Sequence, residues 1–251
     1  MTENGSDSKG AAGRRPTPSP SRLGFYAAVL TAVITTVTFG FALMAIPISG
    51  ANCPGDCVEY PYLETVSQYP RDFLWMPLGI VLVLAYVTLM ASIHRYAPQQ
   101  KRAYSQIALS LALISAAILA ADYYVQFSVI PVSLLNGETE GLPLLIQYNP
   151  HGVFLALEEL GYLVMSLSFA FIAPVFANRS RLESAVRWIF VAAAVLSVVS
   201  LVVISGIYGL ERQDRFEVIV ISVDWLTLIA NGVLLSIVFR RRLRERGSDG
   251  W

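Results

Sequence analysis

Four acidic residues lie within long apolar stretches of this 251-residue chain: Asp122, Glu158, Glu159 and Asp224. A charged side chain near the centre of a membrane span costs about 2.5–3.5 kcal/mol on insertion scales, so such residues usually serve a ligand, a proton or a partner. Clustered carboxyl groups can bind a cation or an amine, and they can act as general acids or bases. These four residues are therefore the first candidates for a functional site.

The spacing of these acids predicts that three of them share one level in the membrane. At a rise of about 1.5 Å per residue, Asp122, Glu158 and Asp224 each lie roughly 10 Å from the same end of their helices. Other polar residues recur at helical spacing near these acids, and such faces should point into a bundle and away from lipid. The complete predicted ligand-binding set is Asp122, Gln126, His151, Glu158, Glu159, Tyr162, Asp224 and Asn231.

The segment 148–152 reads Tyr-Asn-Pro-His-Gly and predicts the start of the helix that carries Glu158. Asn149 can cap a helix, and Pro150 suits the first helical position. His151 lies seven residues before Glu158, a spacing that returns to the same helix face. We therefore expect His151 at the mouth of the site, above Glu158.

The elements that must position these residues follow from composition. Hydrophobic residues make up 55% of the chain and charged residues 14%, whereas a typical soluble domain is about 25% charged. A membrane-spanning helix needs about 20 mostly apolar residues, and such long continuous runs favour helices over barrel strands. The sequence therefore predicts an all-α membrane protein whose transmembrane domain, residues 23–239, has six spans: 23–49, 73–93, 104–128, 153–176, 185–208 and 218–239.

The charges on the flanking segments predict which side of the membrane each end occupies. Fifteen of the 18 Lys and Arg residues lie in the two tails, in two alternate connections or at their borders. The positive-inside rule then places both termini in the cytoplasm and suggests a plasma-membrane protein. Residues 1–22 are rich in Gly, Ser and Pro, which predicts a disordered tail, and residues 240–251 form a basic C-terminal tail.

The chain contains two cysteines, Cys53 and Cys57, and both fall in the first loop on the predicted outer side. Pro54 and Gly55 between them favour a turn, and an oxidising compartment favours a disulfide. The closed ring would stabilise the fold by about 2 kcal/mol in the chain-entropy model. A metal or redox pair is the alternative, but the spacing is not that of a CxxC motif and no second pair or histidine lies nearby.

Several functional classes are excluded or weakened by what the sequence lacks. Equal numbers of basic and acidic residues, 18 each, give no bulk positive charge for nucleic-acid binding. Two histidines in the whole chain exclude a His-rich metal centre, and none of the common hydrolase, metalloprotease, P-loop or EF-hand motifs is present. The sequence thus indicates no metal site, no cofactor and no catalytic motif, and it carries no signal for an oligomeric state.

Three hypotheses stay open for a chain embedded in a lipid bilayer. The first is binding or transport of a small cationic ligand, an ion or protons by an acidic, aromatic-lined pocket. The second is an enzyme that acts on a lipid or isoprenoid by carboxylate acid–base or metal chemistry. The third is a structural or sensory membrane component whose buried acids are hydrogen-bonding links between helices. The first ranks slightly ahead of the second.

Overall fold

The computed structural model describes residues 20–45, 47–177 and 180–248. Within these ranges the chain is helical, with no strand, and six helices are long and apolar enough to cross a membrane. This confirms the all-α, six-span prediction; the expected disorder of the N-terminal tail concerns residues that lie almost wholly outside the described part. The six helices are α1 (Pro20–Ala42), α2 (Trp75–Tyr96), α3 (Arg102–Ser128), α5 (Val153–Ile172), α6 (Arg181–Tyr208) and α7 (Arg215–Ser248).

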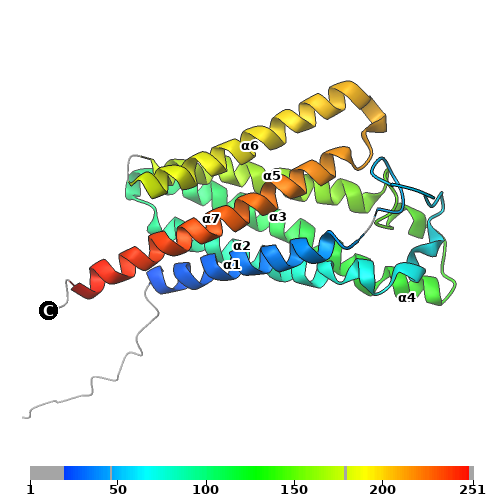
Figure 1. Ribbon diagram of the computed structural model, residues 1–251, viewed down its shortest axis with the longest axis horizontal. Helices are drawn as coiled ribbons and strands as arrows, with labels where there is room; N and C mark the ends of the chain where they lie inside the picture. Colours follow the sequence, from blue (N-terminus) through cyan, green and yellow to red (C-terminus); the bar gives the residue numbers. More distant parts are fainter. Residues whose placement is uncertain (1–19, 46, 178–179, 249–251) are drawn as a thin grey trace, which may run out of the picture.

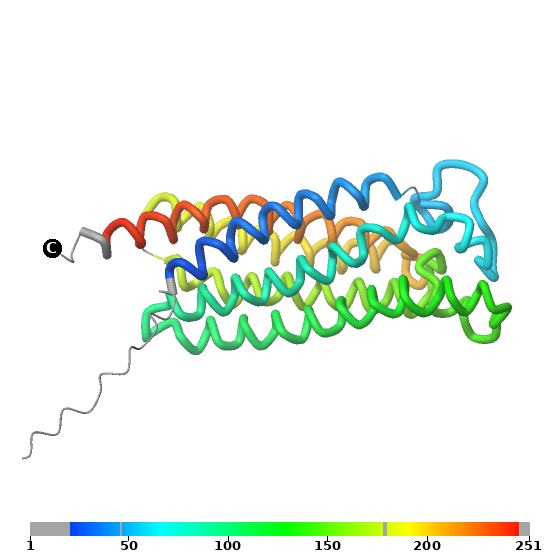
Figure 2. The backbone as a smooth tube through the Cα atoms, turned by 90° about the horizontal axis from the view of Figure 1, so that it is seen from below, coloured from blue at the N-terminus to red at the C-terminus, as the bar shows by residue number. Residues whose placement is uncertain are grey.

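The six helices lie side by side along one axis, and α1 begins at the same end of the bundle at which α7 ends (Figure 1). We call this end the terminal end. The opposite end, the disulfide end, carries the loop of residues 43–74, which contains the Cys53–Cys57 disulfide. The predicted disulfide is thereby confirmed. Figure 2 shows the connection that includes α4 (Ile130–Leu135) at the same end. Short 3-10 turns complete the connections: Leu63–Gln68, Arg71–Phe73, Gln99–Lys101, Leu142–Leu144, Ala173–Phe176 and Gly209–Arg212.

The first and last helices differ from their predicted spans. The first was expected to run to residue 49, but α1 ends at Ala42, and its last turn continues only through turn hydrogen bonds as far as Ala45. Pro47 and Gly50 follow, and neither supports a continued helix. At the other end, α7 continues to Ser248 because residues 240–246 are mostly arginine, leucine and glutamate, which are good helix formers. Most of the predicted basic tail is therefore helical.

Helices α1 and α7 pack closely in the terminal half of the bundle and diverge toward the disulfide end (Figures 1 and 2). A Cβ atom at Gly232 of α7 would lie 2.9 Å from the backbone oxygen of Ala28 in α1, so the close approach requires glycine there. Small residues allow helix backbones to approach in this way.

The connection before α5 folds back onto α3. Gln126 of α3 donates through its amide nitrogen to the Leu145 carbonyl at 2.7 Å and accepts from the Gln147 backbone at 3.2 Å. Gln126, a predicted ligand-binding residue, is thus occupied in holding this connection. Such a buried side chain with both amide ends bonded serves the architecture.

The predicted span 153–176 begins where the structure begins its helix, but the predicted cap is wrong. The Asn149 amide donates to the Pro143 carbonyl at 2.8 Å, and its oxygen accepts from the His151 backbone N–H at 2.9 Å. The helix begins at Val153 after Gly152. His151 therefore precedes the helix, is exposed, and does not share the helical face of Glu158.

Candidate functional site

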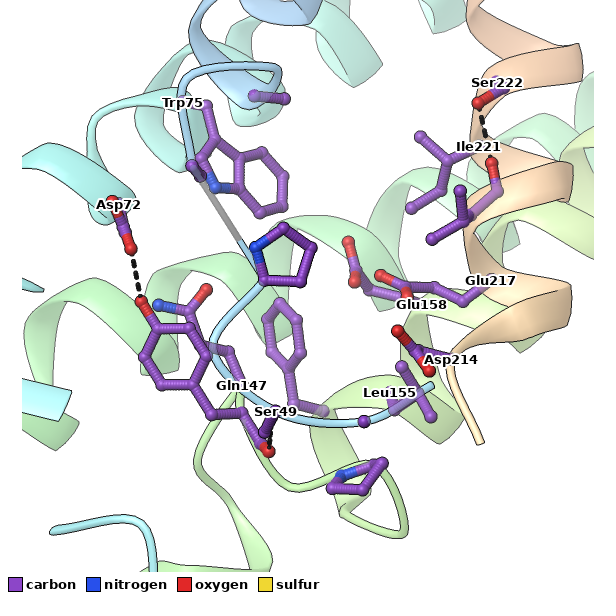
Figure 3. Close-up of a pocket in the computed structure, with 18 of the residues that line it drawn as sticks. Ser49, Asp72, Trp75, Gln147, Leu155, Glu158, Asp214, Glu217, Ile221 and Ser222 are labelled. Atoms are coloured by element: carbon purple, nitrogen blue, oxygen red, sulfur yellow. Dashed lines mark hydrogen bonds between the residues drawn. The ribbon is translucent and has the colours of Figure 1, made fainter. Parts of the chain in front are cut away.

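A cavity of about 330 Å³ lies at the disulfide end, where the ends of α1, α2, α5 and α7 meet (Figure 3). Its walls combine carboxyl groups with aromatic rings, and no Lys, Arg or His is among the described residues that line it. The acidic members are Asp72, Glu158, Asp214 and Glu217, and the aromatic members are Phe39, Trp75, Tyr148, Phe154 and Trp225. This volume is at the lower end of the range that holds small organic ligands.

Glu158 of α5 and Glu217 of α7 face each other in this cavity, close enough for their carboxyl groups to interact electrostatically (Figure 3). Two carboxylates in such proximity repel each other, so a proton or a cation is needed to balance the pair. Glu217 was not among the predicted site residues. A signal was present, because Glu217 lies seven residues before Asp224 on one helical face.

A chain of buried hydrogen bonds supports Glu158 from behind. The Trp225 indole nitrogen donates to the Tyr162 hydroxyl at 3.0 Å, the Tyr162 and Tyr123 hydroxyls are 2.7 Å apart, and Tyr123 donates to Oε1 of Glu158 at 2.7 Å. Because an indole N–H only donates and the Tyr123 proton is committed to Glu158, Tyr162 donates to Tyr123. Every bond in the chain therefore points toward Glu158 and stabilises negative charge on it. Tyr162, a predicted site residue, acts through this chain and does not line the cavity.

Asp122 of α3 adds a third carboxyl group to this region. It is 6% exposed, it lies within electrostatic range of both Glu158 and Glu217, and its Oδ2 atom has no hydrogen-bond partner. The structure thus brings together two of the acids that the sequence predicted, Asp122 and Glu158, and adds Glu217. No basic side chain forms an ion pair with any of the three in the described part of the chain.

Asp224 and Asn231 lie elsewhere in the bundle. Asp224 is fully buried and accepts a hydrogen bond from the Ser166 hydroxyl at 2.6 Å, with the Ser197 hydroxyl 2.7 Å from that of Ser166. Neither Asp224 nor Asn231 lines the cavity, and the Asn231 amide donates to a carbonyl of α6. Because α7 begins at Arg215, it is Glu217 in its first turn that meets Glu158. Asp224 is seven residues, roughly 10 Å, further along the helix.

Glu159 lies beside Glu158 in the sequence but has a basic partner. Its carboxylate, 7% exposed, pairs with the guanidinium of Arg212, which is 32% exposed and belongs to the turn before α7. Two neighbouring residues of a helix project about 100° apart, so Glu159 points to this turn while Glu158 points into the cavity. The ion pair compensates the buried charge of Glu159 and leaves it outside the lining.

Asp214 anchors the disulfide loop above the cavity. Its carboxylate accepts from the Ala51 N–H at 2.7 Å, the Asn52 N–H at 3.3 Å and the Asn52 side chain at 2.9 Å. Gly50, at a φ of 75°, makes room for this contact, because a Cβ atom there would lie 2.9 Å from Oδ1 of Asp214. The left-handed conformation and the close carboxylate both favour glycine. Figure 3 shows the loop passing from Ser49 toward Asp214.

Asp72 is likewise occupied by architectural contacts. Arg71 donates to it at 2.6 Å, and the Tyr148 hydroxyl donates at 2.7 Å. Burial, followed by the hydrogen bond to Asp72, raises the pKa of Tyr148 above its usual value, so this hydroxyl keeps its proton and acts as a donor. The Ser49 hydroxyl, in turn, bonds to the Tyr148 carbonyl and ties the disulfide loop to the start of α5. Of the four cavity acids, Asp72 and Asp214 are held by contacts that build the loops, whereas Glu158 and Glu217 face each other across the cavity, with Tyr123 donating to Glu158.

No protein-family model matches the chain, and no curated protein or solved structure matches it. Among residues 20–45, 47–177 and 180–248, no three His, Cys, Asp or Glu side chains are arranged to hold a metal ion. The chemistry of the site therefore has to be inferred from the cavity itself.

Proposed function

We propose that this six-span membrane protein binds a small organic cation, as a receptor or a transporter, in the cavity of Glu158 and Glu217. The observation that carries the proposal is a pair of facing acids in a hollow of ligand size, with no basic side chain among the described residues that line it. Two facing acids that hold one proton between them retain one negative charge, which attracts a cation. A bound cation would allow both carboxyl groups to ionise, so the second acid would strengthen the binding of the cation.

The aromatic walls favour an amine over a bare metal ion. Trp75 and Trp225 are both buried, their ring centroids are 6.3 Å apart, and both line the cavity. Ammonium groups are attracted to the faces of such rings, most strongly to Trp. The absence of a three-ligand metal arrangement among the described residues points in the same direction.

We further propose that the disulfide end faces the outside of the cell and that both termini are cytoplasmic. The basic residues concentrated at the terminal end follow the positive-inside pattern, and the Cys53–Cys57 disulfide suits an oxidising compartment. Labelling of single cysteines introduced at Glu138 and Glu245, with a membrane-impermeant reagent on intact cells, tests this orientation. Labelling at 245 without labelling at 138 would reverse it.

The binding experiment uses the protein in nanodiscs of neutral lipid and tetramethylammonium as the probe. Intrinsic fluorescence reports on Trp75 and Trp225 in a background that carries Trp188→Phe and Trp251→Phe, and thermal unfolding supplies a second readout. We expect saturable binding that weakens at least about 10-fold in Glu158→Gln and in Glu217→Gln, the loss of one charge-assisted contact. Glu140→Gln, an exposed acid at the same end, is the matched control. Unchanged binding in both cavity variants would contradict the proposal.

A lipid-modifying enzyme is the second candidate, because the cavity reaches the membrane-facing surface at Leu43 and Val218. A pair of carboxyl groups that shares a proton can supply a general acid and a general base. Chemical turnover of extracted lipids by the purified protein, lost in Glu158→Gln, would favour this candidate over simple binding. Flux of the probe into proteoliposomes would identify a transporter.

A further inference from the structure

The cavity is open sideways, between the end of α1 and the start of α7. Two of its lining residues, Leu43 after α1 and Val218 in the first turns of α7, are also exposed on the outer surface of the bundle, at 73% and 43%. A side chain that both lines a cavity and is exposed marks the place where the cavity meets the surface. The opening lies at the ends of two candidate membrane spans, Ser21–Ala42 and Arg215–Glu245, where exposed apolar side chains would face lipid.

This opening follows from how α1 and α7 pack. Gly232 brings the two helices together against Ala28 and Ala32 in the terminal half, and the helices diverge from there toward the disulfide end (Figures 1 and 2). Leu43 and Val218, the exposed lining residues, lie on the diverging side of this contact, one after α1 and one at the start of α7.

The disulfide loop crosses above the cavity on the side of the bundle end. Its backbone at Ala51 and Asn52 is bonded to Asp214 at the start of α7, and Ser49 is bonded to the Tyr148 carbonyl before α5. These contacts tie the loop to two different helix starts and restrict access from the aqueous end. The lateral gap has no comparable hydrogen-bonded bridge among the contacts of the described residues.

Polarity changes across the cavity from its acidic wall to the gap. Glu158 and Glu217 lie on the wall formed by α5 and α7, whereas Ala42, Leu43 and Val218 line the gap with apolar side chains. A ligand that satisfies both parts has a cationic head and an apolar tail. An anionic phosphate placed near the carboxyl pair would be repelled, which argues against a phospholipid with a net negative head.

We propose that the ligand of this cavity is an amphiphilic amine that enters from the lipid leaflet at the disulfide end, with its ammonium head at Glu158–Glu217 and its chain between α1 and α7. This inference rests on the proposed cation-binding function and specifies its ligand class. The apolar chain of the ligand would extend through the gap into the lipid, so the cavity itself does not have to hold its full length.

The test compares trimethylammonium probes that carry methyl, butyl, octyl or dodecyl chains, in the same nanodiscs and with the same fluorescence readout. Affinities are referred to the membrane-bound probe concentration, so that partition into lipid is not counted as binding. We expect the dodecyl probe to bind at least about 10-fold more tightly than the methyl probe, because the gap buries additional methylene groups. Equal affinities on this scale would overturn the inference.

Variants that fill the gap test where the alkyl chain of the probe binds. Leu43→Trp and Val218→Trp, made in the Trp188→Phe, Trp251→Phe background and read by thermal unfolding, should weaken the dodecyl probe about 10-fold and leave the methyl probe within about twofold. Leu226→Trp and Val233→Trp are the matched controls, since they add the same group to exposed positions of α7 outside the cavity lining. An equal effect of gap and control variants would overturn the inference. Methyl-probe binding that depends on Glu158 but not on chain length would leave the proposed function standing, whereas no binding of any probe would reject both.

Discussion

Glu158 and Glu159 are adjacent in α5, both are buried, and they have opposite surroundings. Glu159 forms an ion pair with Arg212, whereas Glu158 meets another acid, Glu217, and lines a cavity. A buried charge with an opposite partner is compensated within the fold. A buried acid that faces a second acid is not compensated within the fold. A bound cation would compensate it.

The same comparison separates the other acids of the disulfide end. Asp214 is bonded to three N–H donors of the disulfide loop, and Asp72 to Arg71 and Tyr148. Asp224 has a hydroxyl partner in the closed core. Burial alone therefore does not separate the acids of the proposed site from the architectural acids; the chemical identity of the partner does.

We expect the largest effect on stability when the basic partner of a buried carboxylate is removed. Arg212→Met leaves the buried Glu159 carboxylate without its cation and should lower the free energy of unfolding by about 2 kcal/mol, less than for a fully buried pair because Arg212 is partly exposed. Reversible unfolding in mixed SDS micelles measures this change. Addition of Glu159→Gln should restore most of the loss.

Arg215→Met, which removes a nearby arginine without an ion pair in the described structure, should cost about 0.5 kcal/mol. If the two arginine variants behave alike, the ion pair is not what stabilises Glu159.

Removal of the loop anchor should have the next largest effect. Asp214→Ala deprives three donors of their acceptor and should cost about 1.5 kcal/mol, with faster protease cleavage in the disulfide loop. Asp56→Ala, an exposed acid in the same loop, is the control. Unchanged cleavage in Asp214→Ala would show that the disulfide alone orders this loop.

Asp224→Asn tests whether the closed-core acid belongs to the site. Asparagine keeps an oxygen that can accept from Ser166, so the free energy of unfolding should fall by at most about 1 kcal/mol. Tetramethylammonium affinity should stay within about twofold of the parent protein. A loss of binding as large as that of Glu158→Gln would return Asp224 to the site, as the sequence had predicted.

Glu158→Gln should have the smallest effect on stability, about 0.5 kcal/mol in either direction. The glutamine oxygen can accept from Tyr123 and its amide can donate to Glu217, so the variant removes the repulsion between two acids and leaves the Tyr123 donor paired. Its neighbour, Glu159→Gln, should cost more because Arg212 loses its ion pair. The comparison fails if Glu158→Gln is the more destabilising of the two variants.

The fold was predictable because its signals are local. Six apolar runs of span length and two cysteines around Pro54-Gly55 predicted the six helices and the disulfide, and the structure confirms both. The candidate site was predictable only in part. Asp122 and Glu158 lie in the same acidic region, whereas Gln126 holds a connection, His151 is exposed before α5, and Asn231 lies deeper in the bundle.

The sequence by itself determined the hydrophobic runs, the helical spacing of polar residues and the separation of charge between the two ends. Only the tertiary structure decided which acid meets which partner. The relative position of two helices depends on where each begins and how it packs. Because α7 begins at Arg215, Glu217 faces Glu158 and Asp224 does not. The 100° between Glu158 and Glu159 then directed one to the cavity and the other to Arg212. Neither pairing can be predicted from residue spacing along a single helix, because both depend on contacts between segments that are distant in the chain.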